Sequence, residues 1–399
     1  MQGNNSDNVR RHNLGAILRQ VHRNGPTSRS NLTRLTGLNR STVAALVTEL
    51  VELGLAVERE PDPTNQVGRP SPIVVASGRI AALAVNPEID AVTVGVIGLD
   101  GVVHRRIRRP FHTSPSAADA VEAVVGIVDG MRAELDSEFR IVGIGVAVPG
   151  LVRASDGLVR LAPQLGWADE PVAPASIAAT GYPVVAANDA SLGVLAERYF
   201  GVGIGLTDVI YLNGGASGIG GGLIVGGVAV GGAGGYAGEF GHTSVGATGR
   251  TDSAGIGGTL EAEVTRRDLL RVLDLSIETD ADGLERALLA STSPAVREEV
   301  NRQQDALAVA LAGAVNILNP ELIVLGGFLA ALFAVDPDRL RAAVAARALP
   351  ASYGSVQISS ALLGSNLLMI GAAEIAFERL LDDPSGFGVS AGAAAPAGR

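Results

Sequence analysis

A glycine-rich stretch at residues 217–261 constrains the fold of this chain more than any other segment, because it gathers turn-forming glycines around a few acidic and imidazole side chains. It opens with SGIGGG after an apolar run at residues 209–212, and glycines there let backbone N–H groups approach a ligand that a Cβ would block. Further along, GEFGH holds Glu239 and His242, and Glu261 closes the stretch. Such groups suit hydrogen bonding to a polyhydroxylated ligand, although each alone is more typical of a turn or a solvated side chain.

The composition is that of a globular protein. With 399 residues and 47% hydrophobic content, the chain can form two or three domains with cores of their own. No apolar run has the uninterrupted length of a membrane span, and residues 1–11 lack the apolar core of a signal peptide, so we expect a cytoplasmic protein with no membrane contact. The chain has no cysteine, which excludes disulfides, a thiol nucleophile and thiolate metal ligands.

The charge is unevenly distributed. Residues 1–47 hold seven arginines and one acidic residue, a net charge of +6, whereas the whole chain carries −10 and the remainder therefore −16. A basic head on an acidic body is typical of a DNA-binding module joined to a small-molecule domain.

The head has the pattern of a helix-turn-helix. Apolar residues at helical spacing predict a first helix over residues 9–24. Ser28 or Ser30 can cap a second helix, Gly37 supplies a tight turn, and Asn39 can cap a third.

One face of the third helix is apolar, which leaves a short polar face of the kind that enters the major groove. Residues 55–59 and 73–76 then read as two strands around a polar tip, which is the pattern of a wing that reaches DNA phosphates or the minor groove. The alternative is a helical pair that serves only for dimerisation. The expected DNA contacts are Arg29, Asn39, Arg40, Ser41, Thr42, Ala44, Thr48 and, from the wing, Arg69.

From about residue 80 the chain alternates strands with helices, which predicts two α/β lobes with a cleft between them. The expected elements are a hairpin at 92–97 and 102–106, a helix at 117–135, buried strands at 141–148 and just before Asn188 and Asp189, helices at 192–200 and 300–318, a strand at 322–325 and a helix at 367–381. Residues 383–399 have low complexity and predict a disordered tail.

Three motifs occur together in this order: GASGIGGGLIVGG at residues 215–227, GGYAGEFGHTSVG at 234–246 and LNPELIVLGG at 318–327. This combination resembles the ROK family (repressors, open reading frames and sugar kinases) over about residues 10–380. The resemblance implies an α/β protein with a winged helix-turn-helix at residues 9–79 and a two-lobed actin-like ATPase (RNase H-like) body at residues 80–382, followed by the tail.

The resemblance also implies a sugar site. In the sugar kinases an Asn-Asp pair binds the sugar, and its Asp is the general base; the pair here is Asn188 and Asp189. The remaining implied contacts with sugar hydroxyls are Glu239, His242 and Glu261. Gln164 stands where the family usually has Asn.

Two motifs depart from the family pattern. Residues 85–90, VNPEID, replace the kinases' Asp-x-Gly-Gly-Thr phosphate motif, so an acid expected near Mg²⁺ is Asn86, and Pro87 and Glu88 remove a backbone donor and add negative charge. In the family's zinc motif, aligned on Glu261, the three cysteine positions hold residues that do not form a structural zinc site: Asp252, Ala254 and Thr259. We therefore expect no bound metal and no catalytic residue, with ATP, Mg²⁺ and a basic role for Asp189 only if the chain is a kinase.

The resulting expectation is a sugar-responsive transcriptional regulator, a repressor of carbohydrate genes, that binds operator DNA and a carbohydrate effector as a homodimer or homotetramer. One alternative is an ATP-dependent hexose kinase with an appended head. Another is a sugar-binding module whose head only dimerises.

Overall fold

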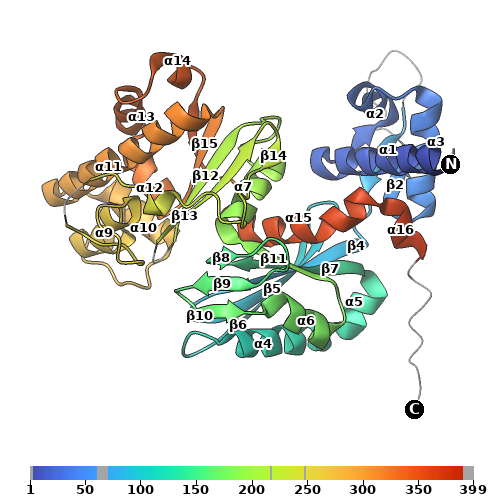
Figure 1. The fold of residues 1–399 in the computed structure, drawn as a ribbon, viewed down its shortest axis with the longest axis horizontal. Coiled ribbons are helices and arrows are strands. Elements are labelled where there is room, and N and C mark those ends of the chain that lie inside the picture. The colour runs from blue at the N-terminus through green and yellow to red at the C-terminus, as the bar shows by residue number, and fades with distance from the viewer. Residues whose placement is uncertain (1–2, 61–70, 216–217, 247–248, 390–399) are drawn as a thin grey trace.

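The computed structural model describes residues 3–60, 71–215, 218–246 and 249–389 and places them in a head and a two-lobed body (Figure 1). The head lies at the right of the view in blue. The N-lobe, residues 80–188, lies below in blue-green and green, and the C-lobe, residues 189–366, lies at the left in yellow and orange. In the described part of the chain no helix is both apolar enough and long enough to span a bilayer.

Three helices and a small sheet form the head. The side chain of Ser28 caps the second helix by accepting from the Asn31 N–H, and Asn39 caps the third by accepting from the Thr42 N–H. The arrangement is that of a winged helix-turn-helix, although the wing tip at residues 61–70, with Arg69, lies outside the described residues. The elements are α1 (Gly3–Asn24), β1 (Thr27–Ser28), α2 (Arg29–Thr36), α3 (Arg40–Glu52), β2 (Ala56–Arg59) and β3 (Ile73–Ala76), with strand order β1-β3-β2.

The N-lobe is built on a five-stranded sheet of order β11-β7-β4-β5-β6, with a small sheet of order β10-β9-β8 beside it. Its helices α4 and α6 cover one face of the larger sheet (Figure 1). The elements are β4 (Ile80–Pro87), β5 (Ala91–Gly98), β6 (Val103–Pro110), α4 (Ala117–Gly130), α5 (Arg132–Glu138), β7 (Arg140–Val148), β8 (Leu151–Val152), β9 (Val159–Ala162), β10 (Trp167–Glu170), α6 (Val172–Thr180) and β11 (Val184–Asn188).

The C-lobe is built on a second five-stranded sheet, of order β14-β13-β12-β15-β16. Its strands and helices are α7 (Asp189–Phe200), β12 (Val209–Gly214), β13 (Ile219–Val225), β14 (Val228–Ala229), η1 (Phe240–His242), α8 (Leu260–Glu263), α9 (Arg266–Val272), α10 (Ala281–Ala290), α11 (Pro294–Leu318), β15 (Leu322–Gly327), α12 (Phe328–Val335), α13 (Pro337–Ala345), α14 (Pro350–Tyr353), β16 (Gln357–Ser360) and η2 (Gly364–Asn366). Two helices, α15 (Leu367–Asp382) and α16 (Pro384–Val389), then end the described chain.

The two lobes repeat one plan. In each, three consecutive strands pair antiparallel, and the first of them also pairs in parallel with the fourth, which in turn pairs in parallel with the fifth. The turn between β4 and β5 in the N-lobe therefore corresponds to the turn between β12 and β13 in the C-lobe. This duplication is that of the actin-like fold, as the family resemblance implies.

Helix α15 lies between the head and the two lobes (Figure 1). Glycines let its backbone approach three different elements: Gly145 of β7 faces the Ala372 carbonyl, Gly371 of α15 itself faces Leu192 of α7, and Gly15 of α1 faces Leu381. At each of these glycines a Cβ would clash with backbone atoms of the neighbouring helix. Close-packed interiors cannot absorb that volume without moving, so α15 is held in one position against the head and both lobes.

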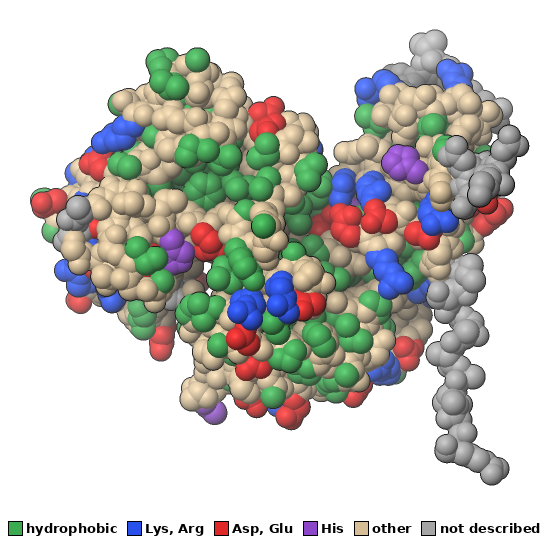
Figure 2. Space-filling view, viewed as in Figure 1, with side chains coloured by type: hydrophobic (Ala, Val, Ile, Leu, Met, Phe, Trp, Pro, Cys, Tyr) green, Lys and Arg blue, Asp and Glu red, His purple; other side chains and the backbone are tan. Residues whose placement is uncertain are grey.

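The head and the body share a hydrophobic core, which contains buried side chains of α1, α3, β4 and α15. Within it the imidazole of His22 bonds to the Glu374 carboxylate and the Leu99 carbonyl and packs edge-on against Phe200 and Phe377. Around this core, acidic and basic side chains gather where the head meets the body (Figure 2), among them Arg19 paired with Asp382 and Arg23 paired with Glu378.

The structure corrects three expectations from the sequence. The first helix begins at residue 3 rather than 9, and the helix expected at 117–135 is two helices, α4 and α5, that meet at Met131. The tail expected to be disordered from residue 383 begins with α16, whose Phe387 stacks under the Arg140 guanidinium at 4.0 Å from the ring centroid. Residues 390–399 lie outside the described residues.

We predict opposite effects for two helical glycines. Gly371→Ala places a methyl group against the Leu192 backbone and should destabilise the fold by about 1–3 kcal/mol. Gly313→Ala, in α11 with nothing within 4 Å of the added Cβ, should stabilise it by about 0.5–1 kcal/mol through helix propensity. Chemical denaturation of the two variants measures both effects. Equal stability of the two variants would contradict the close packing of α15.

Candidate functional site

Helix α3 presents an exposed face in the head. Its apolar side chains Val43 and Val47 are buried, whereas Arg40, Ser41 and Thr48 are exposed. Thr42 and Ala44 are partly exposed on the same helix. Short side chains around a single arginine leave this helix accessible to a flat, charged surface such as the floor of a major groove.

Two of the expected DNA contacts, Arg29 and Asn39, form hydrogen bonds within the head. Arg29 forms a bidentate ion pair with Glu58 of β2, with both N–O distances at 2.5 Å, and so ties α2 to the sheet instead of extending a free guanidinium. The Asn39 carboxamide oxygen accepts from the Thr42 N–H at 2.8 Å and from the Ser41 hydroxyl at 2.7 Å, so it holds the start of α3. Asn39 remains exposed beside Arg40, Ser41 and Thr48, and the DNA contacts of these residues stay predictions.

Ligand groups from α7, α8 and the loops of the C-lobe gather at strand β13. The N–H of Ile219, at the start of this strand, donates to Glu261 Oε2 at 3.1 Å, and a Cβ at Gly218 would lie 2.6 Å from the same oxygen. A Cβ at Gly220 would lie 3.9 Å from Asp189 Oδ1. Gly218 therefore makes room for the Glu261 carboxylate and Gly220 for the Ala190 methyl group at 3.1 Å, whereas the sequence pattern alone predicts room for a bound ligand.

Glu239 and His242 complete the group. His242 Nε2 lies 3.9 Å from Glu239 Oε2, and the charge of Glu239 acts on Asp189 as well. Four of the five expected sugar contacts, Asp189, Glu239, His242 and Glu261, thus lie within electrostatic reach of one another. Carboxylates accept hydrogen bonds from hydroxyls, and imidazole Nε2 accepts when His242 is neutral and donates when it is protonated, which suits a polyhydroxylated ligand.

The side chain of Asn188 caps α7, and its expected contact with a sugar stays a prediction. Its carboxamide oxygen accepts from the Ser191 N–H at 3.0 Å and caps α7, while its nitrogen donates to the Gly150 carbonyl at 3.0 Å. These bonds hold Asp189 at the first position of α7. Asn188 is therefore a residue that positions Asp189, and its side chain is engaged by the protein itself.

Two acidic groups of the cluster, Asp189 and Glu239, have raised pKa values. Burial raises the pKa of Asp189 to about 6, the Ala190 N–H opposes this shift, and the negative charge of Glu239 adds to it. Burial also raises the pKa of Glu239, with His242 opposing and Glu261 reinforcing the shift. A carboxyl group that titrates near neutral pH can accept a hydrogen bond from a hydroxyl or donate one to it. When such a buried group is ionised, it lowers the stability of the fold.

An ion-pair cluster occupies the turn between β4 and β5. Arg108 of β6 donates to the Asp90 carboxylate at 2.7 Å and to the Glu88 carboxylate at 3.2 Å, and the Thr93 hydroxyl donates to Glu88 at 2.6 Å. A phosphate at this turn would meet two carboxylates that are already paired. The corresponding turn of the C-lobe has no such charge on its described residues and closes through Gly215 N–H to the Gly218 carbonyl at 2.9 Å.

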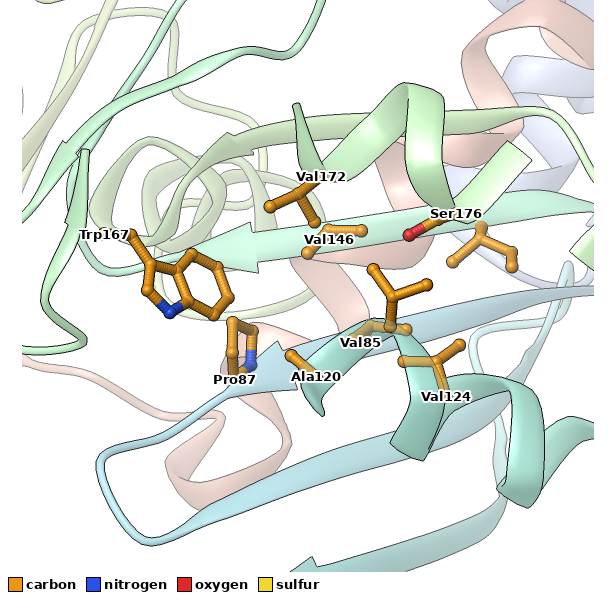
Figure 3. Close-up of a pocket in the computed structure, with 10 residues that line it drawn as sticks. Val85, Pro87, Ala120, Val124, Val146, Trp167, Val172 and Ser176 are labelled. Carbon is orange, nitrogen blue, oxygen red and sulfur yellow. The ribbon is translucent and has the colours of Figure 1, made fainter. Parts of the chain in front are cut away.

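Pro87 belongs to the N-lobe core. It lines a cavity of about 10 Å³ between the sheet and helices α4 and α6, where it lies beside the indole of Trp167 (Figure 3). Next to it, a wider apolar groove of about 400 Å³ opens between α4 and α6, with Glu122 and Glu170 among its lining residues. Neither hollow contains the polar cluster at β13, and their apolar walls do not suit a carbohydrate.

The sequence pattern did not reveal Arg108 or the role of Asp252. Arg108 lies in a run of arginines on an exposed strand, and only the fold brings it to the 88–90 turn. Asp252 Oδ2 accepts from His242 Nδ1 at 2.8 Å, and the Asp252 side chain is fully buried. Its place in the family motif was the available signal, since it stands at the first cysteine position.

The raised pKa of Asp189 predicts a pH-dependent gain in stability for Asp189→Asn. Between about pH 4 and pH 6 the folded protein binds more protons at this site than the unfolded chain, so wild-type stability falls as the pH rises through this window. The asparagine variant avoids this loss and should be about 1–3 kcal/mol more stable than wild type at pH 7.5 and equal to it at pH 4. Denaturant melts at the two pH values, with the exposed Asp136→Asn as control, measure the difference. A gain of the same size at both pH values would contradict the burial of a titrating Asp189.

Comparisons with known proteins agree with this architecture. The xylose repressor of Caldicellulosiruptor bescii is 25% identical over 383 residues, which is 92% of this chain and 96% of that protein. The glucokinase of Thermotoga maritima is 27% identical over 308 residues, covering 94% of its own length but 72% of this chain. Among solved structures, a ROK family transcriptional regulator, a homolog of the E. coli MLC protein, has the same fold, with a TM-score of 0.76 at 22% identity over 94% of this chain and 97% of that one.

The model of the ROK family matches residues 88–379, from the β4–β5 turn to the last turn of α15. This range contains the C-lobe, the N-lobe except β4, and all the residues of the cluster at β13. The chain therefore belongs to the ROK family.

Proposed function

We propose that this protein is a sugar-responsive transcriptional repressor whose kinase-like body binds a carbohydrate without phosphorylating it. The observation that carries the proposal is the joining, in one chain, of a capped and exposed α3 to a body whose hydroxyl-binding groups converge at β13. The similarity to a xylose repressor extends over nearly the whole of both chains, whereas the glucokinase match leaves more than a quarter of this chain uncovered.

The partners follow from this function. Operator DNA binds to α3, and the wing with Arg69 contacts the DNA backbone. A two-fold symmetric homodimer, alone or within a tetramer, presents two heads to inverted half-sites. The effector is a carbohydrate held by Asp189, Glu239, His242 and Glu261, and the protein needs neither a metal ion nor a nucleotide to bind it.

Arg40 provides the direct test of DNA binding. In vitro selection from random duplexes first identifies the preferred sequence. Arg40→Ala should then weaken binding to that duplex by about five- to a hundredfold, since one arginine contact to a base or phosphate is removed. The control is Arg286→Ala, which removes the same charge from an exposed position on α10. Fluorescence anisotropy measures both; an Arg40→Ala affinity equal to that of the control would remove α3 from the DNA interface.

A sugar kinase is the second candidate, and Asp189 favours it, because a carboxylate with a pKa of about 6 suits a general base near neutral pH. Against it stands the ion-paired turn at residues 88–90, because phosphoryl transfer requires a metal ion and donors that neutralise the phosphates.

We expect no sugar-dependent ADP release with Mg-ATP and D-glucose or D-xylose in a coupled assay, with the Thermotoga maritima glucokinase as positive control. Multiple turnovers by the wild-type chain would establish the kinase instead.

A further inference from the structure

Asp252 is the centre of a closed hydrogen-bond network in the loop before α8. Its Oδ1 accepts from the N–H groups of Ala254 at 2.9 Å and Ile256 at 2.8 Å. Its Oδ2 accepts from His242 Nδ1 at 2.8 Å and from the Thr259 hydroxyl at 2.9 Å. A carboxylate has about four lone-pair sites, so each site of this buried group has a donor.

The loop is closed around the same residue. The Asp252 N–H donates to the Ile256 carbonyl at 2.9 Å, and the Gly255 N–H donates to the Asp252 carbonyl at 3.1 Å. Gly255 adopts φ +79°, which favours glycine at this turn. The segment therefore folds back on Asp252 and presents its backbone donors to the carboxylate.

A structural zinc ion does not fit this arrangement. His242, Asp252 and Glu261 each bring a possible ligand atom within 4.8 Å of the others. However, the lone pairs of Asp252 are occupied, and Glu261 accepts from the Ser253 N–H and hydroxyl and from the Ile219 N–H. Ala254 has no ligand atom. Zinc would have to break this network to gain two carboxylates and one imidazole, a poor set for a structural site.

We propose that Asp252 takes the place of a metal ion as the anchor of this loop and, by doing so, positions His242 for the ligand. A carboxylate can only accept, so His242 Nδ1 must carry a proton, and Nε2 is the nitrogen that faces Glu239. The next residue, Ser253, holds Glu261 by donating its N–H and its hydroxyl to the Glu261 carboxylate. One short loop thus orients two ligand groups without a metal ion. This inference rests on the proposed role of His242 and Glu261 in carbohydrate binding.

The alternative is that Asp252 only stabilises the loop. Two variants separate these roles, because they remove different partners of one carboxylate. Asp252→Asn keeps the size of the side chain but replaces an acceptor facing His242, whereas Thr259→Val removes a donor to Asp252 and leaves the His242 contact intact. Loss of loop stability should be common to both variants, and a change at His242 should be confined to the first.

The experiment uses nitrogen NMR of the imidazole rings in the full-length protein, with the His242 signals assigned by His242→Gln. In wild type and Thr259→Val, neutral His242 should have its proton on Nδ1; in Asp252→Asn that preference should be lost. Calorimetry with D-xylose and with D-glucose should show affinity at least about tenfold weaker in Asp252→Asn and within about twofold of wild type in Thr259→Val, as expected when a buried polar contact to a ligand is misdirected. Elemental analysis of untagged wild type should find zinc far below one per chain.

Three outcomes would overturn the proposal: a neutral His242 in wild type with its proton on Nε2, the same change in both variants, or stoichiometric zinc whose removal melts the loop. The His242 tautomer and the metal content of wild type require neither sugar nor a variant, so a proton on Nε2 or stoichiometric zinc overturns the proposal even if Asp252→Asn fails to fold. Failure of wild type to bind either sugar would count against the proposed effector class and leave the imidazole result standing.

Discussion

The buried contact between α1 and α15 is the interaction on which the rest of the structure depends, because it makes the head and the body parts of one core. Burial is the largest single influence and would lower the pKa of His22 and raise that of Glu374. The opposite charges and the hydrogen bonds together outweigh it and shift the two pKa values the other way, so the pair is held as an ion pair. Removing Glu374 would leave the buried His22 imidazole without its charged partner. The head is therefore fixed to α15 by a buried ion pair as well as by close packing.

Helix α7 links this junction to the ligand groups. Asp189 is the first residue of α7, and Phe200, the last, packs against the His22 ring in the head. Gly371 brings α15 against Leu192, near the start of α7. A ligand that contacts Asp189 would therefore act on one end of α7, while the other end packs against the head. A ligand can shift the head only through such differential contacts with two arrangements of the body.

Local features could be predicted from the sequence, whereas features made by distant contacts could not. Ser28 and Asn39 cap their helices because capping needs only neighbouring residues, and the buried face of α3 follows from spacing. The ion pair of Arg29 with Glu58 and the cluster around Arg108 join residues far apart in sequence, and α16 forms from a low-complexity segment because Phe387 finds a partner on the N-lobe. The repeated plan of the lobes is visible in strand order alone, since their sequences share no recognisable repeat. The convergence of four ligand groups was predictable from motifs, but the bond from Asn188 to the distant Gly150 carbonyl required the structure.

The central claim is that the state of the carbohydrate site controls the affinity of the head for DNA. Its most direct test is the dissociation constant of wild-type protein for its selected duplex, measured by fluorescence anisotropy as a function of the concentration of a sugar that binds by calorimetry. The account predicts a change of about five- to a hundredfold between no sugar and saturating sugar, with no sugar consumed. A dissociation constant that stays the same at saturation with each sugar that binds would contradict it.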